Sequence, residues 1–127
     1  MSTNDNILPP LGDRGLKIYH NPRCRKSREG LAILENSGKE FQIIKYLEHN
    51  LTEKELNEII NLLNISPIDL VRKTEKIWKE NYKGKELSDK QIITAMLKYP
   101  KLIERPIVVN NKKAVIGRPS EEITNII

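Results

Sequence analysis

Residues 16–46 read LKIYHNPRCRKSREGLAILENSGKEFQIIKY, and this stretch decides the fold. Residues 16–19 and 41–46 are short apolar runs of the kind that form buried strands. Between them, residues 27–36 carry apolar residues at helical spacing, and Gly38 follows where a left-handed residue ends many helices. A strand, a helix and a strand over so short a length predict a βαβ unit with a parallel strand pair and a right-handed crossover.

Residues 52–99 carry the signals of a helical layer. Thr52 and Ser88 each stand three residues before a Glu or a Gln, which is the capping-box pattern that opens helices. The Ser-Pro pair at 66–67 predicts a further helix start, because proline suits the first helical position. We therefore expect a helical insert at about 52–99.

The last third of the chain returns to strands. Residues 106–109 and 114–116 are apolar and β-branched, and the polar residues between them predict an antiparallel hairpin. Pro119, followed by two glutamates and several isoleucines, predicts a C-terminal helix. The expected order is βαβ, a helical insert, then ββα, which gives an α/β domain over residues 15–127 with a mixed four-stranded sheet. We expect residues 1–14 to form a disordered N-terminal arm.

The composition of the chain limits its size class, its cellular compartment and its partners. A chain of 127 residues is long enough for one ordinary core. One cysteine allows no internal disulfide, and no Cys/His cluster has metal-ligand spacing, so we expect a reducing compartment and no metal. Without a leader-like or membrane-spanning apolar stretch, the cytoplasm is the expected location. The lysines and arginines behind the net charge of +5 are interspersed with acidic residues, which argues against a nucleic-acid partner, and the lack of a long apolar stretch argues against a membrane partner.

Cys24 is that single cysteine, and it stands directly before the first predicted helix. Helix N-termini and neighbouring cations lower the pKa of a thiol by stabilising the thiolate. Four cations lie close in sequence, and His20 would add to their effect if protonated; the four are Arg23, Arg25, Lys26 and Arg28. A buried, inert cysteine is the alternative, but so many charged neighbours are costly to bury. We therefore interpret Cys24 as a nucleophile.

Five stretches of the chain resemble a known family. They are residues 19–28 (YHNPRCRKSR), 46–48 (YLE), 70–73 (LVRK), 104–109 (ERPIVV) and 118–121 (RPSE). Their order and spacing are similar to those of the glutaredoxin-coupled arsenate reductases, from about residue 16 to residue 127. The resemblance implies a thioredoxin-like fold, which agrees with the order of elements read from the residues.

The resemblance also implies the roles of particular residues. Cys24 would be the nucleophile, and His20 would help to keep it ionised. The arsenic oxyanion would be held by Arg72, Arg105 and Arg118, a role that suits the planar, always charged guanidinium group. Three further residues would be structural parts of the site, namely Asn21, Ser27 and Pro106, with a cis peptide bond before the proline.

The function implied by the resemblance is the reduction of arsenate to arsenite, with glutathione as co-substrate and glutaredoxin as partner. We expect a monomer with no bound cofactor. The chain departs from the family pattern at Arg25-Lys26, where arsenate-active members have Gly-Thr. Two alternatives therefore stay open, a reductase of glutathionylated proteins and a regulator that binds RNA polymerase. Regulators of this kind usually have a second cysteine where this chain has Ser27.

Overall fold

A computed structural model describes residues 16–48, 51–110 and 113–127. The expected arm at 1–14 and the tip of the predicted hairpin turn, residues 111–112, lie outside the described residues. The strands are β1 (Leu16–Tyr19), β2 (Phe41–Ile44), β3 (Ile107–Val109) and β4 (Ala114–Ile116). The α-helices are α1 (Arg25–Ser37), α2 (Glu53–Leu63), α3 (Lys76–Asn81) and α4 (Asp89–Lys98). The 3-10 helices are η3 (Pro67–Leu70), η4 (Pro100–Leu102) and η5 (Ser120–Asn125).

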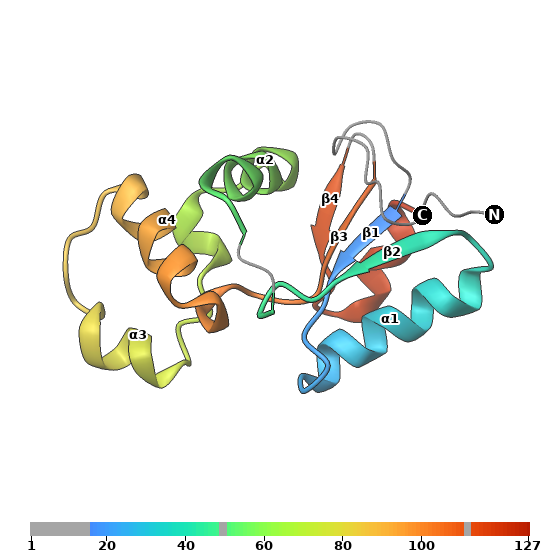
Figure 1. The fold of residues 1–127 in the computed structure, drawn as a ribbon, viewed down its shortest axis with the longest axis horizontal. Helices are drawn as coiled ribbons and strands as arrows, with labels where there is room; N and C mark the ends of the chain where they lie inside the picture. Colours follow the sequence, from blue (N-terminus) through green and yellow to red (C-terminus); the bar gives the residue numbers. More distant parts are fainter. Residues whose placement is uncertain (1–15, 49–50, 111–112) are drawn as a thin grey trace.

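The strands form the predicted mixed sheet, in the order β2-β1-β3-β4 (Figure 1). β1 pairs in parallel with β2 and antiparallel with β3, and β3 pairs antiparallel with β4. The βαβ unit and the C-terminal hairpin are therefore confirmed, and the architecture is the thioredoxin-like α/β fold.

Each face of the sheet has its own hydrophobic core, because successive side chains of a strand point to opposite faces. Ile18 and Val108 pack with Leu34 of α1 and Ile123 of η5 on one face. On the other face, alternate residues of β1 and β3 pack with the helical insert; among them are Tyr19, Ile107 and Val109. Figure 1 shows α1 beside the sheet and α2, α3 and α4 gathered as a separate helical layer.

The insert follows its sequence signals closely. Thr52 and Ser88 both form the predicted capping boxes, at the starts of α2 and α4. The Ser-Pro pair at 66–67 opens the 3-10 helix η3, and not an α-helix, because the chain returns to an extended conformation at Val71. An isolated bridge between Val71 and Ile103 then ties the insert to the segment that leads into β3. None of the helices in the described ranges is long and apolar enough to cross a membrane.

Some predicted elements differ from the structure in their bounds or their type. α1 begins at Arg25 and not at residue 27. Its N-cap residue is Cys24, whose side chain makes no capping hydrogen bond. Its C-cap is Gly38 with a φ of 75°, as predicted. The expected C-terminal helix is the 3-10 helix η5, which begins after Pro119.

Candidate functional site

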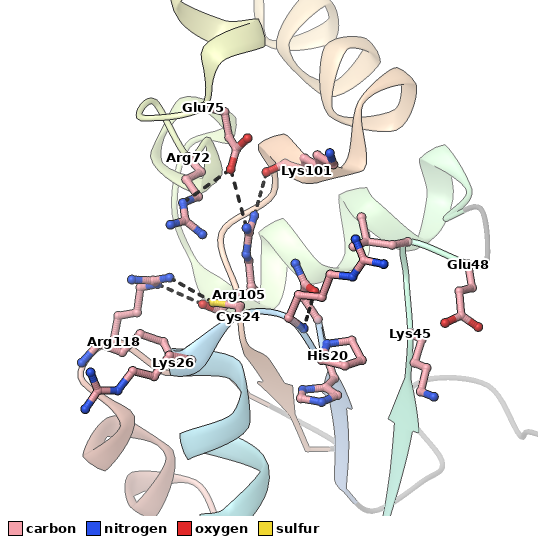
Figure 2. A pocket seen from close by; sticks show the side chains of 15 residues that line it. His20, Cys24, Lys26, Lys45, Glu48, Arg72, Glu75, Lys101, Arg105 and Arg118 are labelled. Atoms are coloured by element: carbon pink, nitrogen blue, oxygen red, sulfur yellow. Dashed lines mark hydrogen bonds and ion pairs between the residues drawn. The ribbon is translucent and has the colours of Figure 1, made fainter.

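Cys24 lies in the loop that follows β1, where it caps the amino end of α1. It lines a pocket of about 840 Å³ (Figure 2). The same pocket is lined by the other residues that the sequence analysis singled out for chemistry, namely His20, Arg72, Arg105 and Arg118. Segments that are distant in sequence therefore meet at the end of α1.

The pKa of the Cys24 thiol is lowered from its ordinary value. Partial burial acts in the opposite direction and is the largest single influence, because it disfavours the charged form. It is outweighed by the backbone N–H of Ser27, then by Arg105 and the backbone N–H of Lys26. The first free N–H groups of α1 and one distant guanidinium therefore favour the thiolate.

Three of the four cations close to Cys24 in sequence have other partners. Arg25 and Lys26 both form ion pairs with Glu29, at 3.5 and 3.6 Å, and the Arg25 side chain is 84% exposed. Arg28 donates a hydrogen bond to a backbone carbonyl of the preceding loop, at 3.0 Å. The expectation that the side chains beside Cys24 would surround its sulfur is therefore wrong for these residues. The cations that act on the sulfur come instead from distant parts of the sequence: Arg105 favours the thiolate, and Arg118 donates a hydrogen bond to Sγ at 3.6 Å.

His20, which would add to the effect of the cations if protonated, contacts Ser27 inside the protein. It is buried, and its Nδ1 lies 2.7 Å from the Ser27 hydroxyl oxygen. That oxygen also accepts the Asn21 backbone N–H at 2.9 Å, so one hydroxyl group ties His20 to the loop before α1. Burial, and then the charge of Lys45, lower the pKa of His20. His20 is therefore neutral at neutral pH, and it orients Ser27, whose backbone N–H faces the sulfur.

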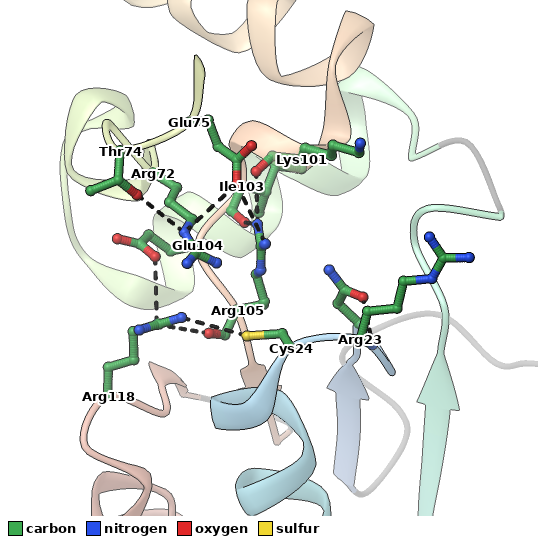
Figure 3. Close-up of polar contacts among 11 residues, drawn as sticks. Arg23, Cys24, Arg72, Thr74, Glu75, Lys101, Ile103, Glu104, Arg105 and Arg118 are labelled. Atoms are coloured by element: carbon green, nitrogen blue, oxygen red, sulfur yellow. Dashed lines mark hydrogen bonds and ion pairs between the residues drawn. The ribbon is translucent and has the colours of Figure 1, made fainter. Parts of the chain in front are cut away.

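Arg105 is the most deeply buried of the three arginines, with 6% of its surface exposed. Its Nη1 donates to the carbonyl oxygens of Lys101 at 2.7 Å and Ile103 at 3.3 Å, and its Nη2 lies 3.6 Å from Oε2 of Glu75 (Figure 3). Its Nε is buried and has no hydrogen-bond partner among the described residues. Two backbone carbonyls and one carboxylate thus hold this guanidinium in place.

Arg118 joins the end of β4 to the cysteine. Its Nη2 donates to Sγ of Cys24 at 3.6 Å, and its Nε donates to the carbonyl of Arg105 at 2.9 Å. The same Nε lies 3.5 Å from Oε1 of Glu104. Arg118 therefore contacts the thiol directly and is oriented by backbone and carboxylate groups.

Arg72 completes the set from the end of η3. Its Nε donates to the Thr74 hydroxyl at 3.3 Å and lies 3.8 Å from Oε2 of Glu75, the oxygen that also faces Arg105. Sequence reasoning missed Glu75 and Glu104 as parts of the site. The i, i+3 spacing of Glu75 from Arg72 and the adjacency of Glu104 to Arg105 were the only signals for them.

Pro106 packs against α1, the helix that follows Cys24. A Cβ atom on Gly30 of α1 would come within 2.8 Å of Cγ of Pro106, so only glycine permits this close approach. The Arg105–Pro106 peptide bond is cis, as the resemblance implied, and the Arg118–Pro119 bond is cis as well.

The chemistry available here is that of a thiolate surrounded by guanidinium groups. Such a group of residues can hold a tetrahedral oxyanion and attack its central atom, or attack a disulfide. Within the described ranges there is no group of three or more His, Cys, Asp or Glu side chains that could hold a metal ion.

Comparison with known proteins gives the family. The model of the ArsC family matches residues 19–126, a span that holds Cys24 and all three arginines of the pocket. The chain belongs to the ArsC family.

Among its ArsC relatives, the uncharacterized protein YfgD of Escherichia coli K12 is 45% identical over 88% of this chain and 96% of its own. The arsenate reductase of Haemophilus influenzae is 41% identical over 87% of this chain and 97% of its own. The solved structure of the arsenate reductase from Vibrio cholerae superposes with a TM-score of 0.83 at 46% identity, over 88% of this chain and 97% of that one.

Proposed function

We propose that this protein is an arsenate reductase in which Cys24 is the nucleophile. The observation that carries the proposal is the Arg118–Cys24 contact of 3.6 Å, made in a pocket that Arg72 and Arg105 also line. Relatives named arsenate reductase, at 41% and 46% identity, support the same reaction.

The pocket offers what the first step needs. The Cys24 thiolate attacks the arsenic atom, a sulfur–arsenic bond forms, and one arsenate oxygen leaves as water after protonation. Arginine charges offset the negative charge that the oxyanion brings to the thiolate. Ser27 and Lys26 contribute backbone N–H groups, so the departure from Gly-Thr at 25–26 leaves the backbone donors in place.

Reduction needs two electrons, which we assign to external thiols. Glutathione attacks Sγ of Cys24, a disulfide forms, and the electron pair of the broken sulfur–arsenic bond stays with arsenic, which leaves as arsenite. Glutaredoxin then takes the glutathionyl group and frees the thiolate. An external second thiol is required because Cys24 is the only cysteine of the chain.

A coupled assay tests the proposal. Wild type and Cys24→Ser are incubated with arsenate, glutathione and glutaredoxin, and arsenite is measured directly. We expect glutathione-dependent turnover in the wild type and none in Cys24→Ser. Undiminished turnover in the variant would defeat the nucleophile assignment.

The same assay separates the alternatives left open by the sequence. A wild type that forms no arsenite but exchanges glutathione at Cys24 would favour a reductase of glutathionylated proteins. A wild type that does neither and co-purifies with RNA polymerase would favour a regulator.

A further inference from the structure

We propose that one part of the pocket is a binding site for the two carboxylates of glutathione. This part, here called the basic lobe, is lined by Arg23, Lys45, Leu47, Glu48 and Lys101. The inference rests on the proposed function, because it places the co-substrate of that reaction.

The cations of the pocket fall into two groups. Those of the first group already face carboxylates: Arg72 and Arg105 face Glu75, Arg118 faces Glu104, and Arg25 and Lys26 face Glu29. In the part of the chain that the structure describes, the three cations of the basic lobe form no ion pair with a carboxylate; they are Arg23, Lys45 and Lys101. Charges that converge on a pocket without partners favour an anionic ligand.

Three separate elements bring these cations together. Arg23 comes from the loop before α1, Lys45 directly follows β2, and Lys101 belongs to η4. In Figure 2, Lys45 and Glu48 lie on one side of Cys24, whereas Arg72 and Arg118 lie on the other. Figure 3 draws Arg23 on the side away from Arg118 as well. Arg23, Lys45 and Glu48 thus lie on the side of Cys24 away from Arg118, and Lys101 lies beside Arg105, whose Nη1 donates to the Lys101 carbonyl at 2.7 Å.

The size of the pocket also leaves room for a second occupant. Its volume of about 840 Å³ lies within the range of roughly 300–1,000 Å³ that holds drug-sized ligands, far more than one oxyanion fills. Glutathione has two carboxylates, one ammonium group and a central thiol. The lobe offers three cations for the carboxylates, the Glu48 carboxylate for the ammonium group and the 38% exposed Leu47 as an apolar surface.

Thiol–disulfide exchange tests this site without arsenate. In oxidised glutathione, the Cys24 thiolate attacks one sulfur, a mixed disulfide forms, and one glutathione thiolate leaves; the rate is followed by the mass increment on the protein. Bis(2-hydroxyethyl) disulfide serves as the neutral reagent, since it reacts at the same sulfur but carries no carboxylate.

The test variant replaces all three cations of the basic lobe with alanine. We expect its rate with oxidised glutathione to fall by about tenfold or more at low salt, because the attraction for the carboxylates is lost. Its rate with the neutral disulfide should stay within about twofold of the wild type. The matched control removes the same charge from exposed lysines outside the pocket, as Lys39→Ala, Lys54→Ala and Lys85→Ala combined.

Two results would overturn the proposal. One is an equal fall with both reagents, which would mean that the lobe acts on the reactivity of Cys24. The other is a fall in the charge-matched control as large as that in the test variant, which would mean that net charge alone matters. Failure of the proposed function is a separate result, because the exchange assay contains no arsenate. A wild type that makes no arsenite would still react faster with oxidised glutathione than the test variant does.

Discussion

Sγ of Cys24 accepts a hydrogen bond from Nη2 of Arg118 at 3.6 Å, although the two residues stand 94 positions apart in the chain. The same guanidinium donates through Nε to the carbonyl of Arg105, at 2.9 Å. One side chain therefore links the cysteine loop, the start of β3 and the end of β4. Because the thiol, the guanidinium groups and the free N–H groups of α1 meet at this point, the chemistry of the protein is expected here.

We predict that Cys24 is alkylated as a thiolate at pH values below the ordinary pKa of a thiol. Its lowered pKa means that the reactive form persists as pH falls, so the midpoint of the iodoacetamide rate profile should lie below about 8.5. Arg105→Met should move that midpoint upward, since the variant lacks the cation that favours the thiolate. Arg25→Ala is the control and should leave it unchanged, because the exposed Arg25 pairs with Glu29. A wild-type midpoint at about 8.5 or above would contradict the prediction.

A second prediction concerns His20 and the pH dependence of stability. Its folded-state pKa is lowered, so the unfolded chain binds a proton more readily than the native protein does. This contribution to stability is fully present above the unfolded pKa of about 6.5 and is lost as pH falls through the folded pKa. Urea unfolding at pH 7 and pH 5 should therefore show a smaller loss on acidification for His20→Gln than for the wild type. Equal losses would indicate that the pKa of His20 is not lowered in the native state.

Ser27 should contribute to stability well beyond its size. Its hydroxyl oxygen accepts the Asn21 N–H at 2.9 Å and contacts Nδ1 of His20 at 2.7 Å, and all three residues are buried. Ser27→Ala leaves both partners without a bond, which costs about 1–3 kcal/mol in the free energy of unfolding. Thr124→Ala, which removes an exposed hydroxyl, is the control and should cost within about 0.5 kcal/mol. Equal costs for the two variants would show that the buried network is not stabilising.

Glu75 should limit how strongly the pocket binds anions. Its Oε2 lies 3.6 Å from Nη2 of Arg105 and 3.8 Å from Nε of Arg72, so one carboxylate offsets part of the charge of both cations. Glu75→Gln should lower the Kd for sulfate by several-fold, measured by calorimetry at low salt. Glu80→Gln, on an exposed pair with Lys76, is the control and should have little effect. Weaker binding in Glu75→Gln would mean that Glu75 serves mainly to position the arginines.

The fold was largely predictable, because its signals are local. Each signal depends on residues only a few positions apart in the chain. These signals are the capping boxes at Thr52 and Ser88, the C-cap glycine Gly38 and the apolar runs of the strands. Boundaries were missed where such a signal is weak. β2 was expected to reach Tyr46 but ends at Ile44, because the chain turns there with a hydrogen bond from the Glu48 N–H to the Lys45 carbonyl at 2.9 Å.

The site was less predictable than the fold. Cys24 and the three arginines could be identified from their motifs, and the structure brings them to one pocket. The effect of the neighbouring cations was not predictable, because Glu29 engages two of them through helix geometry that proximity to Cys24 does not reveal. The neutral state of His20 was not predictable either, because it depends on burial and on the charge of Lys45, which is distant in sequence.

A crystal structure of Cys24→Ser grown with arsenate would show whether Arg72, Arg105 and Arg118 converge on residue 24 to bind an oxyanion. We predict one arsenate in the pocket, within hydrogen-bond distance of at least two of the three guanidinium groups and next to residue 24. An empty pocket at saturating arsenate, with the three guanidinium groups turned toward solvent on different faces, would contradict this prediction.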